Sequence, residues 1–226
     1  MIQKSTLQFL MELEKNNYRE WFNDNKSRYE AARENVISVV AELIKEVNKF
    51  EPTLGYPEPK KCMFRIYRDT RFSKNKEPYK TNMGAIVGAE GNTKTLKSGY
   101  YMHIQPGASF VSCGVYVPPS PVVKAIRTAI DNDFDTFSGI LGNKAFKRYF
   151  DDLSREDGAL QRVPPGFDKK SPAAEYLKLK SFYVWYQFTD KELMSEDFVK
   201  NAAKVLKVTK PLNDWLNVII EDVEFN

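Results

Sequence analysis

Apolar residues recur at helical spacing over residues 1–50, and two start signals divide this segment. Ser5 opens a Ser-x-x-Gln run with the spacing of a capping box, which predicts a short helix ending at about Lys15. Asn17 is a second capping residue, followed by apolar positions that suit one helical face. We expect that second helix to run to about Asn48, so the chain should begin with a helical layer.

The pattern changes to short, β-type runs in the middle of the chain. The expected strands are residues 62–68, 83–88, 99–105, 109–117 and 181–188. A turn at residues 105–108 should join two of these strands in an antiparallel hairpin. Loops are expected at residues 50–59, which contain three prolines and a glycine, and at residues 91–99. The sheet should therefore be mainly antiparallel.

Helices return after the hairpin. Ser120 as cap and Pro121 at the first helical position predict a helix that continues, with breaks near Asp131 and Gly142, to about residue 155. Further helices are expected at residues 172–178, after a cap at Ser195, and from about Pro211 onward. The fold class predicted is α+β, with helices flanking one sheet in a single compact domain. Its parts would be a helical segment at 1–50, a sheet core at about 62–117 plus 182–188, and a helical C-terminal part.

Composition restricts the class of protein. The 226 residues are 42% hydrophobic, which is enough for a full core, yet no apolar run approaches the 18 residues of a membrane span. Charges interrupt the first residues, and no apolar core or cleavage site of a signal peptide is present there. We expect a cytoplasmic protein with no membrane partner.

Few residues suit a metal or redox site. Cys62 and Cys113 form no CxxC pair, so both are expected to be small buried hydrophobes. His103 is the single histidine, which excludes any site with several imidazoles. The acidic run at residues 131–135 lacks the glycine and glutamate that an EF-hand requires, so a helix cap explains it better than calcium. No metal ligand is assigned, no cofactor follows, and carboxylate-bound Mg²⁺ or Mn²⁺ stays open.

Positive charge is concentrated in one segment. Residues 60–80 contain eight bases and two acids, a balance of +6, whereas the whole chain has a net charge of +4. The remaining residues therefore sum to −2. A basic excess confined to one segment favours a local anion site over a surface that is basic throughout.

The bases of this segment leave two predicted strand ends and could converge on one point. Arginine presents a planar fork that suits phosphate or carboxylate, and lysine adds a mobile charge. The candidate ligand-binding bases are Arg65, Arg68, Arg71, Lys76 and Lys80. Asp69 could orient a neighbouring arginine or act as a base. His103 shares a strand face with Tyr101 and Gln105, so it is the second candidate acid or base, with a pKa lowered if cations lie beside it.

The chain resembles a known family at four places, which together span nearly its full length. These are "FLMELEKNNYREWFNDNKSRYE", "FRIYRDTRFSKNKEPYKTNMG", "GYYMHIQPGASFVSCGVY" and "RVPPGFDKKSP". They resemble the uncharacterised, mainly bacterial proteins of the domain of unknown function 2461. The resemblance implies one domain of mixed α and β structure and carries no established activity.

The central motif is the most specific part of this resemblance. The positions that match the family pattern are Arg65, Arg68, Asp69, Arg71, Phe72, Ser73, Lys76, Pro78, Tyr79 and Lys80. The resemblance thereby adds Ser73 and Tyr79 to the candidate ligand-binding residues.

Three functions suit the basic segment. The first is binding of a small phosphorylated or carboxylated ligand, with or without catalysis by His103 or Asp69. The second is nucleic-acid binding, in which Tyr67, Phe72 or Tyr79 could stack on bases. The third is a non-catalytic module that docks an acidic protein. No dinucleotide fingerprint, P-loop, GxSxG or kinase signature occurs, so those catalytic classes are disfavoured.

Overall fold

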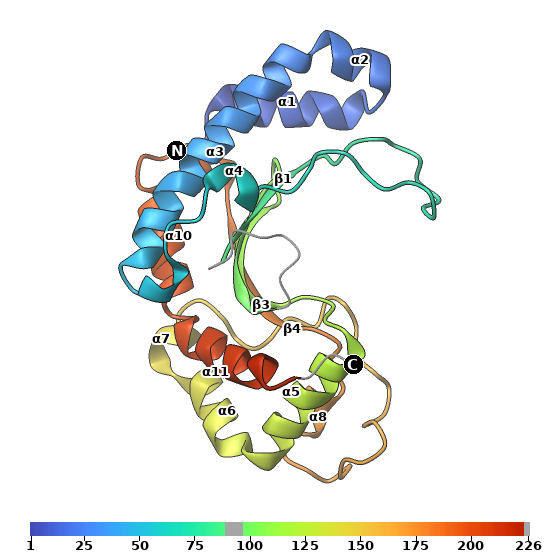
Figure 1. Cartoon of the computed structure of the whole chain (residues 1–226), viewed down its shortest axis with the longest axis vertical. Helices are drawn as coiled ribbons and strands as arrows, with labels where there is room; N and C mark the ends of the chain where they lie inside the picture. The colour runs from blue at the N-terminus through green and yellow to red at the C-terminus, as the bar shows by residue number, and fades with distance from the viewer. Residues whose placement is uncertain (89–96, 224–226) are drawn as a thin grey trace. The chain divides into compact units, whose positions relative to one another are not determined.

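The computed structural model describes residues 1–88 and 97–223, and it confirms the α+β class (Figure 1). The α-helices of the described residues are α1 (Lys4–Lys15), α2 (Arg19–Asp24), α3 (Lys26–Asn48), α4 (Pro59–Cys62), α5 (Ser120–Asn132), α6 (Phe134–Gly142), α7 (Lys144–Lys147), α8 (Ala174–Leu177), α9 (Asp190–Leu193), α10 (Phe198–Lys207) and α11 (Lys210–Glu221). A 3-10 turn, η1 (Pro52–Leu54), lies between α3 and α4.

Four antiparallel strands form one sheet in the order β1-β2-β3-β4. They are β1 (Met83–Val87), β2 (Gly99–Ile104), β3 (Ser109–Val115) and β4 (Phe182–Phe188). The predicted hairpin of β2 and β3 is confirmed, and its turn is closed by the Ala108 N–H donating to the Gln105 carbonyl at 3.0 Å. The loop expected at residues 91–99 lies mostly outside the described residues.

The chain divides into two compact units, and the boundary between them crosses the sheet. Of the described residues, the first unit holds 1–88, 100–111 and 187–204, and the second holds 97–99, 112–186 and 205–223. The expectation of one domain stays a prediction.

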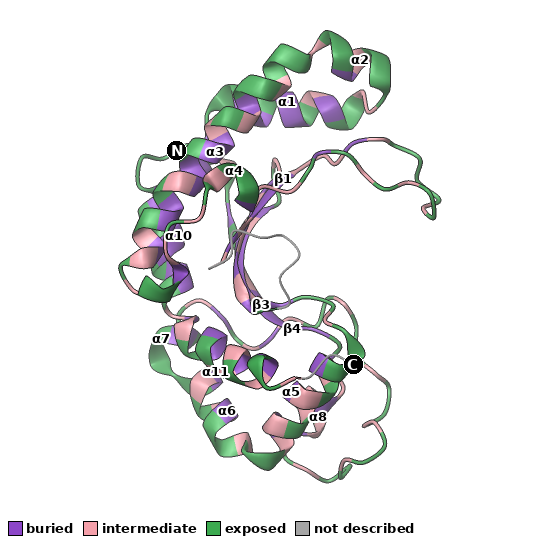
Figure 2. Cartoon of the chain, in the orientation of Figure 1, coloured by how far each residue is buried: buried purple, intermediate pink, exposed green. Residues whose placement is uncertain are grey.

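In the first unit, α3 packs against α1, α4 and β1. One edge of α3 supplies a row of buried aliphatic side chains, including Val36, Val40 and Leu43, which explains why the apolar positions recur at helical spacing. Strand β2 shows the alternation expected of a sheet with one covered face. Its residues Tyr100 and Met102 are buried, while Tyr101 and His103 are only half-buried. Figure 2 shows a similar mixture of buried (purple) and exposed (green) residues along α3.

In the second unit, α5 packs against α6, α8 and α11. Strands β3 and β4 approach closely at Gly114, whose φ of +130° is a conformation that L side chains rarely adopt. A Cβ at Gly114 would collide with the backbone of Phe182 and Tyr183. Glycine at this position therefore permits the pairing of β3 with β4.

Both cysteines are buried, as predicted, one in each unit. Cys62 ends α4, where burial raises the pKa of its thiol to about 11. Cys113 lies in β3, with its Sγ 3.8 Å from the Asn213 Oδ1. Asp133 caps α6 by accepting from the Thr136 N–H at 3.1 Å, so the acidic run at residues 131–135 does cap a helix.

Three predicted helix starts are wrong in detail. The N-cap of α1 is Gln3, so Ser5 lies inside the helix and no capping box forms there. The helix predicted from Asn17 to Asn48 is interrupted at Asn25, between α2 and α3. The N-cap of α2 is Tyr18, and Asn17 hydrogen-bonds the backbone of Tyr79 instead of capping the helix. Ser120 is the first residue of α5, and Pro119 occupies the cap position.

The strand predicted at residues 62–68 does not form. Cys62 belongs to a helix, and the residues after it make only isolated bridges, Met63 with Ala85 and Tyr67 with Tyr79. Because successive residues pair with different partners, the segment leaves the sheet after Phe64. Residues 65–80, which we call the basic arm, then project from the first unit as a long loop (teal in Figure 1).

Candidate functional site

The stem of the basic arm is held by backbone hydrogen bonds and by one asparagine. The Arg68 N–H donates to the Pro78 carbonyl at 2.9 Å, and the Lys80 N–H donates to the Ile66 carbonyl at 2.8 Å. Asn17 accepts from the Tyr79 N–H through Oδ1 at 3.1 Å and donates to the Tyr79 carbonyl through Nδ2 at 3.0 Å. Asn17 thus pairs with Tyr79 as a neighbouring strand would.

We call residues 68–77 the outer arm. Most candidate site residues there make hydrogen bonds or salt bridges to other residues of the arm. Arg71 donates from Nε and Nη2 to the two carboxylate oxygens of Asp69 at 3.0 and 2.7 Å, and this contact lowers the pKa of Asp69. Arg68 lies 3.5 Å from the Glu77 carboxylate. Lys76 donates to the Thr70 carbonyl at 2.9 Å. The predicted role of Asp69 as an arginine partner fits this geometry, whereas a free carboxylate base does not.

Tyr79 and Ser73 contribute backbone and packing contacts. The Tyr79 ring is buried and stacks on Phe22, with ring centroids 3.9 Å apart. The Ser73 N–H donates to the Thr70 carbonyl at 3.3 Å, in the turn at the tip. The structure therefore gives Tyr79 a role in anchoring the arm, and it does not expose that ring to a ligand.

A second group of residues meets where the arm joins the half-buried face of the sheet. We call it the sheet-face cluster. Its members are Phe64, Lys80, Tyr101, His103, Gln105 and Phe110, together with Arg65, an exposed residue whose charge acts on Lys80. The Lys80 Nζ lies 5.3 Å from the centroid of the Phe64 ring, and that ring packs edge-on against Tyr101 at 6.0 Å. All of these residues belong to the first unit.

Both ring nitrogens of His103 are hydrogen-bonded within this cluster. The Tyr101 hydroxyl donates to Nδ1 and Nε2 donates to the Gln105 Oε1, each at 3.0 Å. This pattern suits a neutral imidazole with its proton on Nε2. The imidazole also stacks on Phe110, with centroids 4.6 Å apart. His103 is therefore fixed in orientation and in tautomer.

Gly84 makes room for this arrangement. It is the cross-strand partner of His103 in the pairing of β1 with β2. A Cβ at Gly84 would collide with the Tyr101 hydroxyl, so only glycine lets Tyr101 lie across the sheet and reach the imidazole.

Burial and like charges shift the titration of this cluster. Burial, aided by the Lys80 charge, lowers the pKa of His103, and the hydrogen bond to Gln105 partly opposes this shift. Burial lowers the pKa of Lys80 as well, and the charge of Arg65 adds to the effect. Burial raises the pKa of Tyr101 to about 12. The prediction of a lowered His103 pKa is reproduced in direction, with burial as the larger cause and Lys80 as the neighbouring cation.

The cluster brings together Arg65, Lys80 and His103 from the predicted site. The other predicted site residues lie outside this cluster; they are Arg68, Asp69, Arg71, Ser73, Lys76 and Tyr79. Sequence reasoning placed Tyr101 and Gln105 on the face of His103 but gave them no role. It missed Phe64, Phe110 and Gly84, of which only Gly84 carries a sequence signal, as a glycine within a strand. Within residues 1–88 and 97–223, no group of three or more His, Cys, Asp or Glu side chains could hold a metal ion.

No helix among the described residues has the length and apolar character needed to cross a membrane. Neither a curated protein nor a solved structure matches the chain significantly. A family model described as a conserved hypothetical protein, DUF2461, matches residues 5–215. The match covers nearly the whole chain and includes both the arm and the sheet-face cluster, and we conclude that the chain belongs to the DUF2461 family.

Proposed function

We propose that the chain binds a small anion, through a phosphate or carboxylate group, at the sheet-face cluster. The observation that carries the proposal is the uncompensated positive charge of Lys80. Its ammonium is half-buried beside the like charge of Arg65, and it has no carboxylate partner among the described residues. Burying a charge without a counter-charge is unfavourable, so a bound anion would offset a cost that the fold leaves uncompensated.

The arrangement narrows the predicted set of ligand-binding residues. Arg68 and Arg71 already have carboxylate partners, so they contribute less to an incoming anion than Arg65 and Lys80 do. The Phe64 ring, which packs against Tyr101, lies beside the ammonium and reduces its exposure to water, which strengthens its attraction for an anion. We assign Arg65 and Lys80 as the ligand-binding pair.

The geometry favours binding over proton transfer. Both nitrogens of His103 are engaged, and Asp69 is held by Arg71 outside the cluster. In this proposal His103 lies beside the anion and responds to its charge. Its hydrogen bonds to Tyr101 and Gln105 keep it in place when the anion binds.

The single histidine gives a direct test. A bound anion offsets the repulsion from Lys80, so the pKa of His103, followed by NMR on the untagged chain, should rise when inorganic phosphate or citrate is added. Chloride at matched ionic strength should leave this pKa in place. Lys80→Met keeps the aliphatic stem and should weaken anion binding about 10- to 100-fold.

Lys74→Met is the matched control, because Lys74 is an exposed lysine of the same arm for which the described residues provide no contact. It should bind the anion as the wild type does. If phosphate and citrate move the His103 pKa no further than chloride does, or equally in the wild type and Lys80→Met, the anion site is not at this cluster.

A further inference from the structure

The outer part of the basic arm is an ordered projection. Besides the stem bonds, its tip is closed by contacts of its own, among them the turn at Thr70 and the contact of Lys76 with the same carbonyl. The Asn75 side chain adds two bonds to Glu77, one to its N–H and one to its carboxylate, both at 2.8 Å. The hydrogen bonds within the loop therefore fix the backbone from which the side chains at the tip project.

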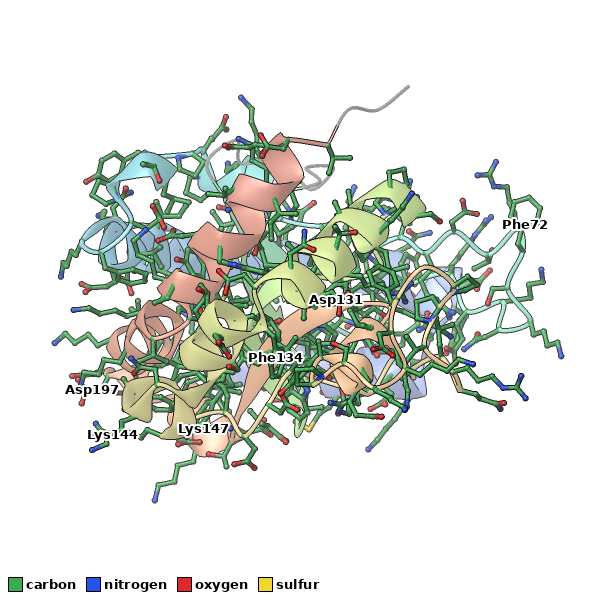
Figure 3. The ribbon with its side chains drawn as sticks, turned by 90° about the horizontal axis from the view of Figure 1, so that it is seen from below. Phe72, Asp131, Phe134, Lys144, Lys147 and Asp197 are labelled. Carbon is green, nitrogen blue, oxygen red and sulfur yellow. The ribbon has the colours of Figure 1, made fainter. Side chains whose placement is uncertain are left out.

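Two aromatic rings of this arm are exposed. Phe72 is 95% exposed and Tyr67 is 54% exposed. Figure 3 shows Phe72 at the outer end of the arm. The Arg71 guanidinium lies 5.8 Å from the Phe72 ring centroid, and its hydrogen bonds to the Asp69 carboxylate hold the guanidinium there. An aromatic ring with this exposure contributes almost nothing to the core, so the ring face away from Arg71 is available to a partner.

Cations that form no salt bridge with a described carboxylate accompany these rings. The arginines of the outer arm are neutralised by its two carboxylates. The arm residues that form no salt bridge with a described carboxylate are Arg65, Lys74, Lys76 and Lys80, although the charge of Arg65 also acts on Asp69. Cations thus extend from the sheet-face cluster at the base of the arm to Phe72 at its tip.

We infer that the basic arm binds a single-stranded nucleic acid. This inference rests on the proposed anion site, since one phosphate would lie at Arg65 and Lys80. Further phosphates would lie near Lys74 and Lys76, and bases would stack on Tyr67 and Phe72. Positive charge combined with exposed aromatic faces is the combination that sequence-tolerant binding of single strands requires.

The dimensions suit a short strand. Tyr67 and Phe72 are five positions apart, which is at most roughly 16 Å along an extended chain and corresponds to about five stacked nucleotides or fewer. An acidic protein fits less well, because the neighbours of Phe72 at the tip are polar or charged and offer no apolar patch for a protein interface.

The test uses a fluorescein-labelled oligouridylate of about eight nucleotides and its deoxythymidylate counterpart, with fluorescence anisotropy as the readout. Wild-type binding should weaken steeply as salt rises, because phosphate contacts release counterions. Phe72→Ala should weaken binding roughly 5- to 100-fold and leave the salt slope unchanged. Lys74→Gln should reduce the slope of log K against log salt by about 0.7.

Two control variants match these changes elsewhere in the first unit. Tyr56→Ala removes an aromatic ring that is 79% exposed, and Lys4→Gln removes an exposed lysine at the start of α1. Both should bind the oligonucleotides as the wild type does. Because Phe72 and Lys74 are exposed, their replacement should leave the melting temperature unchanged.

The inference fails if neither oligonucleotide binds more tightly than inorganic phosphate, or if Phe72→Ala binds as tightly as Tyr56→Ala. If phosphate still raises the pKa of His103 in the same preparations, the small-anion site is supported without nucleic-acid binding. Binding of a polyglutamate peptide that is lost in Phe72→Ala, without oligonucleotide binding, would assign the arm to an acidic protein instead. Loss of both the phosphate and the oligonucleotide response would overturn both proposals.

Discussion

At the scale of single residues, the sheet-face cluster depends on the absence of one side chain. The Tyr101 hydroxyl occupies the space that a Cβ at Gly84 would need, and from there it donates to His103 Nδ1. The orientation of the only histidine is therefore set by a glycine on the neighbouring strand. Alternation along β2 predicts which residues share the face of His103, but it does not predict this contact, because the contact depends on the register between two strands.

Gly84→Ala should displace Tyr101 and break its hydrogen bond to His103. We expect a loss of about 1 to 3 kcal/mol in the free energy of unfolding, typical of an overpacked site, measured by chemical denaturation. Gly88→Ala is the matched control, since the nearest described atom that a Cβ there would meet belongs to the Ile86 side chain, at 4.0 Å. Equal stability of the two variants would show that Tyr101 does not depend on Gly84.

At the scale of elements, patterns that need only local information predict the structure best. The β2–β3 hairpin, the helix α8 and the breaks between α5, α6 and α7 lie where alternation, turns and caps place them. Helix α9 was missed, although Thr189 and Glu192 form a capping box that the sequence displays. Residues 62–68 have the composition of a strand, but their partners, Ala85 and Tyr79, lie on separate segments. A local sequence pattern does not show that one segment pairs with two different partners.

The contact of Asn17 with Tyr79 is another such non-local contact, because 62 positions separate the two residues. Asn17→Ala removes both hydrogen bonds and should loosen the stem of the arm while α1 and α3 stay folded. Hydrogen exchange at the Tyr79 N–H should become roughly 5- to 150-fold faster.

Asn17→Asp provides a graded comparison, because it keeps the acceptor for the Tyr79 N–H and loses the donor to the Tyr79 carbonyl. Exchange in this variant should fall between that of the wild type and that of Asn17→Ala. Unchanged exchange in Asn17→Ala would mean that the backbone bonds of the stem hold the arm without Asn17.

At the scale of the whole molecule, the charge distribution and the family were predictable, whereas the division of the basic residues into two groups was not. The sequence places the basic excess in one segment, and the match to the DUF2461 family confirms the resemblance. The internal pairing of Arg68 and Arg71 leaves Arg65 and Lys80 for the sheet face. Which bases pair within the arm depends on side-chain geometry, and a count of charges along the sequence does not predict it.

The single histidine also affects stability as a function of pH. Burial lowers the pKa of His103 in the folded chain, so between that value and about 6.5 the unfolded chain binds a proton that the folded chain does not. The stability contributed by the neutral imidazole is therefore complete above about pH 6.5 and falls as the pH drops below it. The groups facing His103 are Lys80, Tyr101, Gln105 and Phe110.

Urea unfolding at pH values of about 7.5 and 5.5 tests this dependence. The wild type should have the lower midpoint at the acidic pH, and His103→Gln, which cannot titrate, should show a smaller difference. Carboxylates with lowered pKa values, such as Asp69 and Asp133, lose their contribution only at more acidic pH. An equal pH dependence in both chains would assign the effect to groups other than His103.

The burial of one cysteine in each unit has a consequence for following the motions of the molecule. A buried thiol with a raised pKa, such as that of Cys62, reacts with an alkylating reagent only after the structure around it opens. Peptide mapping separates modification at Cys62 from modification at Cys113. The two labelling rates therefore report the opening of each unit independently, at cysteines that the chain already contains.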